Sequence, residues 1–248
     1  MSVGTMLLQL GKGMISTTEI FFLTLLFSLP LGLFISFGRM SKNGLFRGIS
    51  KFYISIMRGT PLMLQLLVVY FAPYYLFGLN LRGYRFFAII LAFSINYAAY
   101  FAEIYRGGIE SMPAGQYEAA KVLGYNKVQT FVKIILPQVI KRIMPSITNE
   151  TITLVKDTSL AFVLAHAEMF TLAKQIAAKE TSMAPLMAAG VFYYIFNFVV
   201  AFSMERIEKA FNYYRELVSY VRKGTRWKTV QMSYWKLIIC ARDLRGLM

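Results

Sequence analysis

The chain has 248 residues, of which 57% are hydrophobic, and its formal net charge is +15. A water-soluble domain of this length could not bury so much apolar surface, so the composition indicates a membrane protein. In a soluble chain this excess of basic residues would suggest nucleic-acid binding. Here the basic residues lie beside apolar spans and indicate which side of the membrane each loop is on, so we expect no binding to nucleic acid. The single cysteine, Cys240, excludes an intrachain disulfide framework, and the sequence predicts no metal site and no cofactor.

The first predicted membrane span covers residues 14–38. From Ile20 to Gly38 it carries no charge, and at about 1.5 Å per residue this stretch can cross the hydrocarbon core. Pro30 is expected to kink the helix. A polar loop should follow, and its basic residues indicate that the loop is cytoplasmic and the amino terminus is outside. These residues are Arg39, Lys42, Arg47 and Lys51.

Two further spans are predicted over residues 59–81 and 86–104. The short loop between them is expected on the outer side, although it carries Arg82 and Arg85 and so departs mildly from the positive-inside bias. Asn96 lies within the third span. A polar side chain at that depth is expected to hydrogen-bond a neighbouring helix.

A polar segment over residues 112–138 follows the third span. Glu118 falls early in its first predicted helix, where the helix dipole favours negative charge. Ala119 and Ala120 leave little side-chain bulk, so another surface can approach the backbone closely. Gly124 permits a turn that a residue with a Cβ would resist. We therefore expect two short helices, joined by a glycine turn, on the cytoplasmic surface.

The second of these helices carries apolar residues at positions i, i+3, i+4, i+7 and i+8, which predicts an amphipathic helix. Pro137 is expected to disrupt its end. The apolar positions are Val128, Phe131, Val132, Ile135 and Leu136.

This segment resembles the EAA signature of permease subunits in ATP-binding-cassette (ABC) importers. The resemblance implies that residues 112–138 form a coupling helix, which sits in a cleft of a separate ATPase subunit. A second stretch, Arg-Gly-Thr-Pro-Leu at residues 58–62 with Gln65 nearby, resembles a segment of polar amino-acid permeases. This resemblance points to the amino-acid group within the ABC importers. The EAA pattern Glu-Ala-Ala-x3-Gly-x9-Ile-x-Leu-Pro is met by Glu118, Ala119, Ala120, Gly124, Ile134, Leu136 and Pro137.

The fourth predicted span, residues 143–167, carries charged side chains that are costly inside a bilayer. Glu150 and Lys156 offer a carboxylate and an ammonium, which complement the two charges of a zwitterionic substrate. Asp157 shares a helix face with Glu150, whereas Lys156 lies on a neighbouring face. The resemblance to amino-acid permeases implies substrate contacts for Glu150, Lys156 and Ser159. The alternative, an internal ion pair between Glu150 and Lys156, stays open.

The fifth predicted span covers residues 181–204, after an outer loop that contains Lys174, Lys179 and Glu180. Residues 216–248 are expected as a basic cytoplasmic tail, in which Lys, Arg and Trp suit an anionic lipid surface. A disordered extension and a translation-frame artefact of the sequence are equal alternatives. We expect this tail to have no role in transport.

The sequence therefore predicts an all-α, polytopic integral membrane protein with five transmembrane helices and a cytoplasmic coupling helix. Residues 1–215 would form the transmembrane domain of an ABC importer for amino acids in a bacterial inner membrane, with the carboxyl terminus in the cytoplasm. No Walker phosphate loop is present, so the chain should not be an enzyme, and a partner ATPase should bind the ATP.

The other expected partners are an extracytoplasmic solute-binding protein, the amino-acid substrate and membrane lipid. A second permease copy or a related permease is also expected, because five helices alone make a poor closed pore. Two alternatives remain at this point. One is an ion-coupled secondary transporter that uses the charges of the fourth span, and the other is a membrane anchor or sensor without transport activity.

Overall fold

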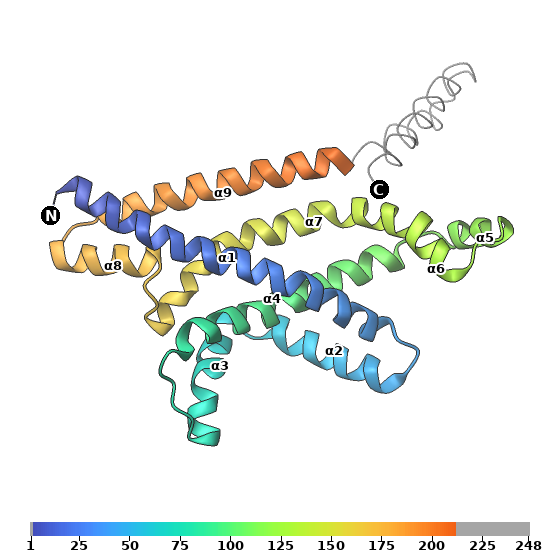
Figure 1. Ribbon diagram of the computed structural model, residues 1–248, viewed down its shortest axis with the longest axis horizontal. Coiled ribbons are helices and arrows are strands. Elements are labelled where there is room, and N and C mark those ends of the chain that lie inside the picture. Colours follow the sequence, from blue (N-terminus) through green and yellow to red (C-terminus); the bar gives the residue numbers. More distant parts are fainter. Residues whose placement is uncertain (1, 212–248) are drawn as a thin grey trace, which may run out of the picture. The chain divides into compact units, whose positions relative to one another are not determined.

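The computed structural model describes residues 2–211, and these form helices and short connections without a β-strand (Figure 1). The chain divides into two compact units, Met1–Arg206 and Ile207–Met248. The predicted tail over 216–248 lies outside the described residues. In chain order the helices are α1 (Val3–Met40), α2 (Gly44–Gly59), α3 (Leu62–Phe77), α4 (Tyr84–Glu110), α5 (Ala114–Val122), α6 (Lys127–Thr130), a π-helix (Phe131–Ile135), α7 (Leu136–Asp157), a 3₁₀-helix (Thr158–Leu164), α8 (Met169–Glu180) and α9 (Ala184–Phe211).

α1 packs against α4 along a line of small side chains, and Figure 1 shows the two helices crossing. Thr24, Ser28 and Gly32 are buried on α1 at four-residue spacing, which lets the two backbones approach closely. An added Cβ at Gly32 would lie only 2.9 Å from the Cβ of Phe101 on α4. α1 begins well before the predicted span, and the helix continues through Pro30 without a break.

The polar loop predicted after the first span is wrong, because these residues form the amphipathic helix α2. Asn43 supplies a strong start signal, since its Oδ1 accepts a hydrogen bond from the Leu45 N–H at 2.9 Å. Apolar side chains such as Phe46 and Ile49 remain exposed on this helix and suit a lipid surface. Clustered basic residues can therefore lie on an interfacial helix as readily as in a loop.

A bend of 112° between α2 and α3 lies at the start of the predicted second span, residues 59–81, and α3 forms most of that span. Pro61 has no N–H to continue the helical ladder, so carbonyl groups at the end of α2 need other donors. The side-chain amides of Gln65 and Asn96 each donate to the Met57 carbonyl at 3.0 Å. Asn96 also donates to Gln65 Oε1 at 2.9 Å. The prediction that Asn96 bonds a neighbouring helix is confirmed.

The predicted fourth span begins earlier than expected, at the start of α7, and does not remain a straight α-helix. After Asp157 it tightens into the 3₁₀-helix, and Ala165 then adopts a left-handed conformation with φ of 49°. The outer loop predicted before the fifth span is wrong, because α8 forms there. The fully buried Glu168 caps α8, and its carboxylate accepts hydrogen bonds from the Phe170 and Thr171 N–H groups at 2.7 and 2.6 Å.

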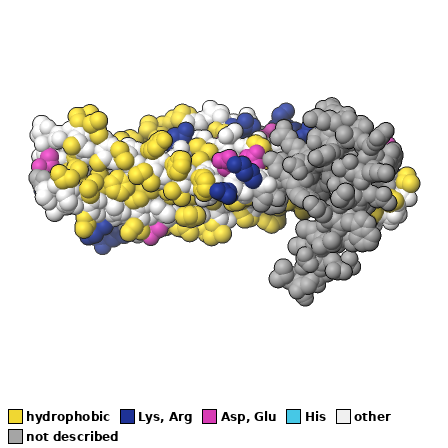
Figure 2. Space-filling model, turned by 90° about the horizontal axis from the view of Figure 1, so that it is seen from above, with side chains coloured by type: hydrophobic (Ala, Val, Ile, Leu, Met, Phe, Trp, Pro, Cys, Tyr) yellow, Lys and Arg dark blue, Asp and Glu magenta, His cyan; other side chains and the backbone are white. Residues whose placement is uncertain are grey.

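Three described helices, α1, α4 and α9, are long and apolar enough to cross a membrane. The bent pair of α2 and α3 and the bent stretch from α6 to α8 raise the number to five if each is one span, as the sequence predicts. Figure 2 shows hydrophobic side chains over much of the visible surface of the described residues. Exposed aromatic and aliphatic groups of this kind are the expected surface of a protein in lipid.

Candidate functional site

The coupling segment begins with α5 and turns at Gly124, as the sequence predicts. Gly124 has φ of +77°, a left-handed conformation that favours glycine. The Tyr125 N–H donates to the Ala120 carbonyl at 3.0 Å, and the Gly124 N–H donates to the Lys121 carbonyl at 3.0 Å. These two bonds close the end of α5 in the manner of a helix C-cap. The turn therefore depends on a residue without a Cβ.

The side chains around this turn present an exposed apolar surface. Val122 is 88% exposed and Leu123 is 72% exposed, and Val128 in the next helix is 71% exposed. Glu118 and Ala119 are also exposed, whereas Ala120 is fully buried. Apolar groups displayed beside an acidic residue on a short polar segment suit docking to another protein.

The second helix of the segment starts at a capping box. The Gln129 N–H donates to Asn126 Oδ1 at 2.8 Å, and the Asn126 N–H donates to Gln129 Oε1 at 3.1 Å. The helix then passes through the π-helix into α7, so the expectation that Pro137 ends it is wrong. Pro137 lies in the first turn of α7, where its missing N–H is tolerated, and the wider π-turn before it accommodates the ring.

α7 holds the coupling segment at two points. Arg142 donates to the Ser111 carbonyl at 3.0 Å, and the Gln138 amide donates to Gln116 Oε1 at 3.3 Å. Buried Val139 and Ile143 pack against α4 in the same region. The Gln138 bond thus links α7 to α5, and the Arg142 bond links α7 to the end of α4.

Farther along α7, Lys156 and Asp157 lie at its carboxyl end, and Asp157 contacts α4. The buried Tyr97 hydroxyl of α4 donates to Asp157 Oδ2 at 2.7 Å. Lys156 is exposed and lies within electrostatic range of Asp157. Ser159 is also predicted at this site. Its hydroxyl donates to the Lys156 carbonyl at 2.8 Å and so satisfies a carbonyl in the last turn of α7.

Glu150 lies two turns nearer the amino-terminal end of α7 and is half-buried. Among the residues that the structure describes, its carboxylate makes no hydrogen bond and no ion pair, and Lys156 is not its partner. The two charges do not meet because α7 stays helical through both positions, which turns them to different sides.

An ion cluster around Glu103 lies at the end of α4. Arg106 approaches Glu103 to 2.6 Å, whereas Arg39 of α1 is 3.8 Å away and Arg58 of α2 is 4.0 Å away. Arg106 also pairs with Glu110 at 2.5 Å. This cluster and the roles of Tyr97 and Arg58 are not predicted from the sequence. Only the i, i+3 and i, i+4 spacing of the three α4 residues could have indicated part of it.

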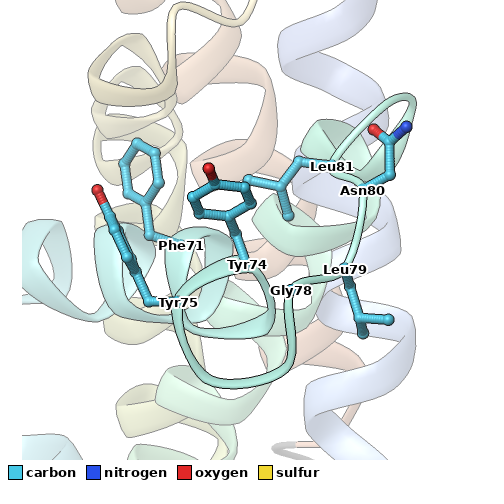
Figure 3. A pocket seen from close by; sticks show the side chains of 7 residues that line it. All are labelled: Phe71, Tyr74, Tyr75, Gly78, Leu79, Asn80 and Leu81. Carbon is cyan, nitrogen blue, oxygen red and sulfur yellow. The ribbon is translucent and has the colours of Figure 1, made fainter.

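A hollow of about 430 Å³ lies at the carboxyl end of α3, away from these charges. Figure 3 shows the Leu81 side chain extending toward the Tyr74 ring, with Phe71 and Tyr75 on the same helix. A second hollow of about 490 Å³ shares Leu81 and also includes Arg82. Neither hollow is lined by a predicted substrate residue. The aromatic lining suits a membrane interface.

The chain matches the family model described as binding-protein-dependent transport system inner membrane component over residues 28–213. It is 36% identical over 205 residues to a putative glutamine transport system permease protein of Rickettsia bellii, covering 82% of this chain and 93% of the relative. It is also 36% identical over 199 residues to an arginine transport system permease protein of Bacillus subtilis, covering 80% and 90%. The crystal structure of an amino acid ABC transporter with histidines is similar at a TM-score of 0.76 and 30% identity, covering 85% of this chain and 100% of that one.

Proposed function

The chain belongs to the family of binding-protein-dependent transport system inner membrane components, and we propose that it carries a polar amino acid along a path between α4 and α7. It is a permease subunit of an amino-acid ABC importer in the inner membrane. Relatives named for glutamine and arginine transport support a polar amino acid as the substrate. The family works with ATPase and substrate-binding partners. Family membership gives no support to a secondary transporter or to an anchor without transport.

The observation that carries the path is the charged layer on α7. Asp157 offers a carboxylate to the substrate ammonium, and the Tyr97 hydroxyl at 2.7 Å holds that carboxylate in place. Lys156 offers an ammonium to the substrate carboxylate and has no competing ion pair within the described residues. Ser159 fixes the carbonyl end of α7, and Glu150 lies on the same path nearer the cytoplasm.

The coupling segment is proposed to bind the partner ATPase through the exposed face around Glu118, Ala119 and Gly124, with the buried Ala120 letting α5 pack closely beneath it. ATP is bound and hydrolysed by that partner, and this chain needs no cofactor. When the ATPase subunits close, they displace α5. The contacts of Arg142 and Gln138 pass the displacement to α7, which carries the substrate groups at its other end.

The remaining assignments follow from the distribution of charge. Basic residues at the end of α1 and near the coupling segment support a cytoplasmic location for both, with the amino terminus outside and the carboxyl terminus in the cytoplasm. A second copy or a related permease completes the pore. The extracytoplasmic solute-binding protein delivers the amino acid on the outer side.

Uptake in proteoliposomes tests this function. The permease is reconstituted with the ATPase and binding protein of the same organism, and labelled glutamine, arginine and histidine are offered with ATP inside. We expect uptake of a polar amino acid that requires ATP and survives collapse of ion gradients by ionophores. Uptake driven by an ion gradient without ATP would contradict the proposal.

A further inference from the structure

Arg58 occupies the end of α2 at the bend before α3, a place where its charge is incompletely neutralised. Its guanidinium carbon lies 5.3 Å from the centre of the Tyr100 ring on α4, and its Nη1 lies 4.0 Å from Glu103. The side chain is 45% exposed. Glu103 is engaged far more closely by Arg106, which donates three hydrogen bonds to its carboxylate at 2.6 to 3.2 Å. Arg58 is therefore available to another anion.

Two tyrosines of α4 connect Arg58 to the Asp157 layer. The Tyr97 and Tyr100 ring centres are 6.1 Å apart, one helical turn along α4. Tyr97 holds Asp157, and Tyr100 lies beneath Arg58. The two polar positions thus lie next to each other along one helix.

The acidic groups of α7 follow the same order. Asp157 contacts Tyr97 and directly follows Lys156, and Glu150 is the next acidic residue of α7 in the direction of its amino-terminal end. The Asp157 layer therefore holds one cation and one carboxylate, the combination that complements a zwitterion. Arg58 and Glu150 offer a second such pair of charges. A helical rise of about 1.5 Å per residue separates Asp157 from Glu150 by about 10.5 Å along α7. The ammonium and carboxylate of an amino acid are attached to one carbon, so a single bound molecule cannot bridge both layers.

We propose that Arg58 is a specificity-determining residue that binds the substrate carboxylate in a second layer, with Glu150 receiving the ammonium, after the amino acid leaves Lys156 and Asp157. This inference rests on the proposed function. The second layer lies toward the cytoplasm, because α4 runs from Tyr97 to Tyr100 in that direction and α7 runs from Asp157 back to Glu150. A substrate lacking either charge would lose one contact in both layers.

The test compares Arg58→Gln with Arg39→Gln in the complete complex with its ATPase and binding protein. Arg39 is a matched control, because its Nε also lies 3.8 Å from Glu103 Oε1 but the residue belongs to α1. Arg58→Gln should lower the uptake rate at saturating substrate by about tenfold or more, since it removes a charge-assisted hydrogen bond. Arg39→Gln should stay within about twofold of wild type. Melting temperatures in detergent are measured for both variants.

The double variant Arg58→Gln with Glu103→Gln separates substrate binding from a structural ion pair. If Arg58 binds substrate, adding Glu103→Gln to Arg58→Gln does not restore uptake. Restored uptake in the double variant would overturn the proposal, and so would equal losses of uptake in Arg58→Gln and Glu103→Gln measured singly. If Arg58→Gln does not assemble, Arg58→Lys replaces it. This variant keeps the charge but loses the guanidinium fork, so uptake should fall several-fold, and wild-type uptake would overturn the proposal. Absence of amino-acid uptake by the wild-type complex would instead contradict the proposed function itself.

Discussion

Gly124→Ala tests the turn of the coupling segment with the smallest possible perturbation. A Cβ added at Gly124 would meet no atom within 4 Å, so the substitution introduces no clash. Its cost comes only from holding φ at +77° with a Cβ present, which is about 1–2 kcal/mol. A difference of about 1.4 kcal/mol is tenfold in an equilibrium constant, so the share of molecules in which the turn departs from its native conformation should rise by about tenfold.

Gly115→Ala is the matched control. Gly115 lies in α5 of the same segment, and its Cβ position is also open. There the backbone is helical, so alanine should stabilise the helix by about 0.5–1 kcal/mol. The same chemical change is therefore predicted to have opposite effects at two glycines that are both exposed on one surface.

The assay is ATP hydrolysis stimulated by substrate-loaded binding protein in the reconstituted complex. Gly124→Ala should insert and assemble normally but lose most of the stimulation, because α5 no longer presents a fixed face to the ATPase. Gly115→Ala should keep it. Equal stimulation in both variants would refute the argument that the left-handed turn positions the coupling surface.

Three other predictions concern separate parts of the chain. Glu150→Gln and Lys156→Met should each impair uptake by roughly ten- to a hundredfold while the complex stays stable, and the double variant should not recover; recovery of folded yield in the double variant would reveal a structural pair. Gly13→Ala should lower the melting temperature in detergent, because its Cβ would lie 2.7 Å from a backbone atom of α8, whereas Gly11→Ala, with open space around it, should not; equal melting temperatures would contradict this contact. Truncation after Arg215 should leave uptake close to wild type at matched expression, because the family match ends at residue 213, and a collapse of uptake in an assembled complex would assign the tail a function.

The features predicted well from the sequence are those that depend on local chemistry. A left-handed glycine and two alanines at fixed spacing define the coupling turn without reference to distant residues. Long charge-free stretches similarly identify α1, α4 and α9, since hydrocarbon thickness sets their length. Asn96 was predictable as a helix-to-helix hydrogen bond, because an amide at that depth needs a partner.

The features that were missed depend on tertiary contacts. Clustered basic residues predict a polar loop where α2 forms, although its apolar face also suits an interfacial helix. A loop is predicted in place of α8 because its N-cap, Glu168, is not one of the usual capping residues and is held in part by the distant Tyr193 of α9. Pro137 predicts a helix end, although a π-turn before it lets the helix continue.

The candidate site is likewise predictable from the sequence only where it depends on local chemistry. The charges of α7 were predicted from their cost in a bilayer, but their partners were not. Tyr97 and Arg58 come from other helices. Helical spacing relates residues within one helix only, so it could not connect these two residues with Asp157 or Glu150. The packing of α4 against α7 brings Tyr97 to Asp157, and the packing of α2 against α4 places Arg58 over Tyr100.

The most direct test of the central claim is the uptake rate of Asp157→Asn in the reconstituted complex, with saturating amino acid and binding protein. The substitution keeps the shape of the side chain and a hydrogen bond with the Tyr97 hydroxyl but removes the charge that receives the substrate ammonium. If the amino acid passes between α4 and α7, the rate should fall by roughly tenfold or more while the complex remains assembled. Uptake within about twofold of wild type would contradict a substrate path at this position.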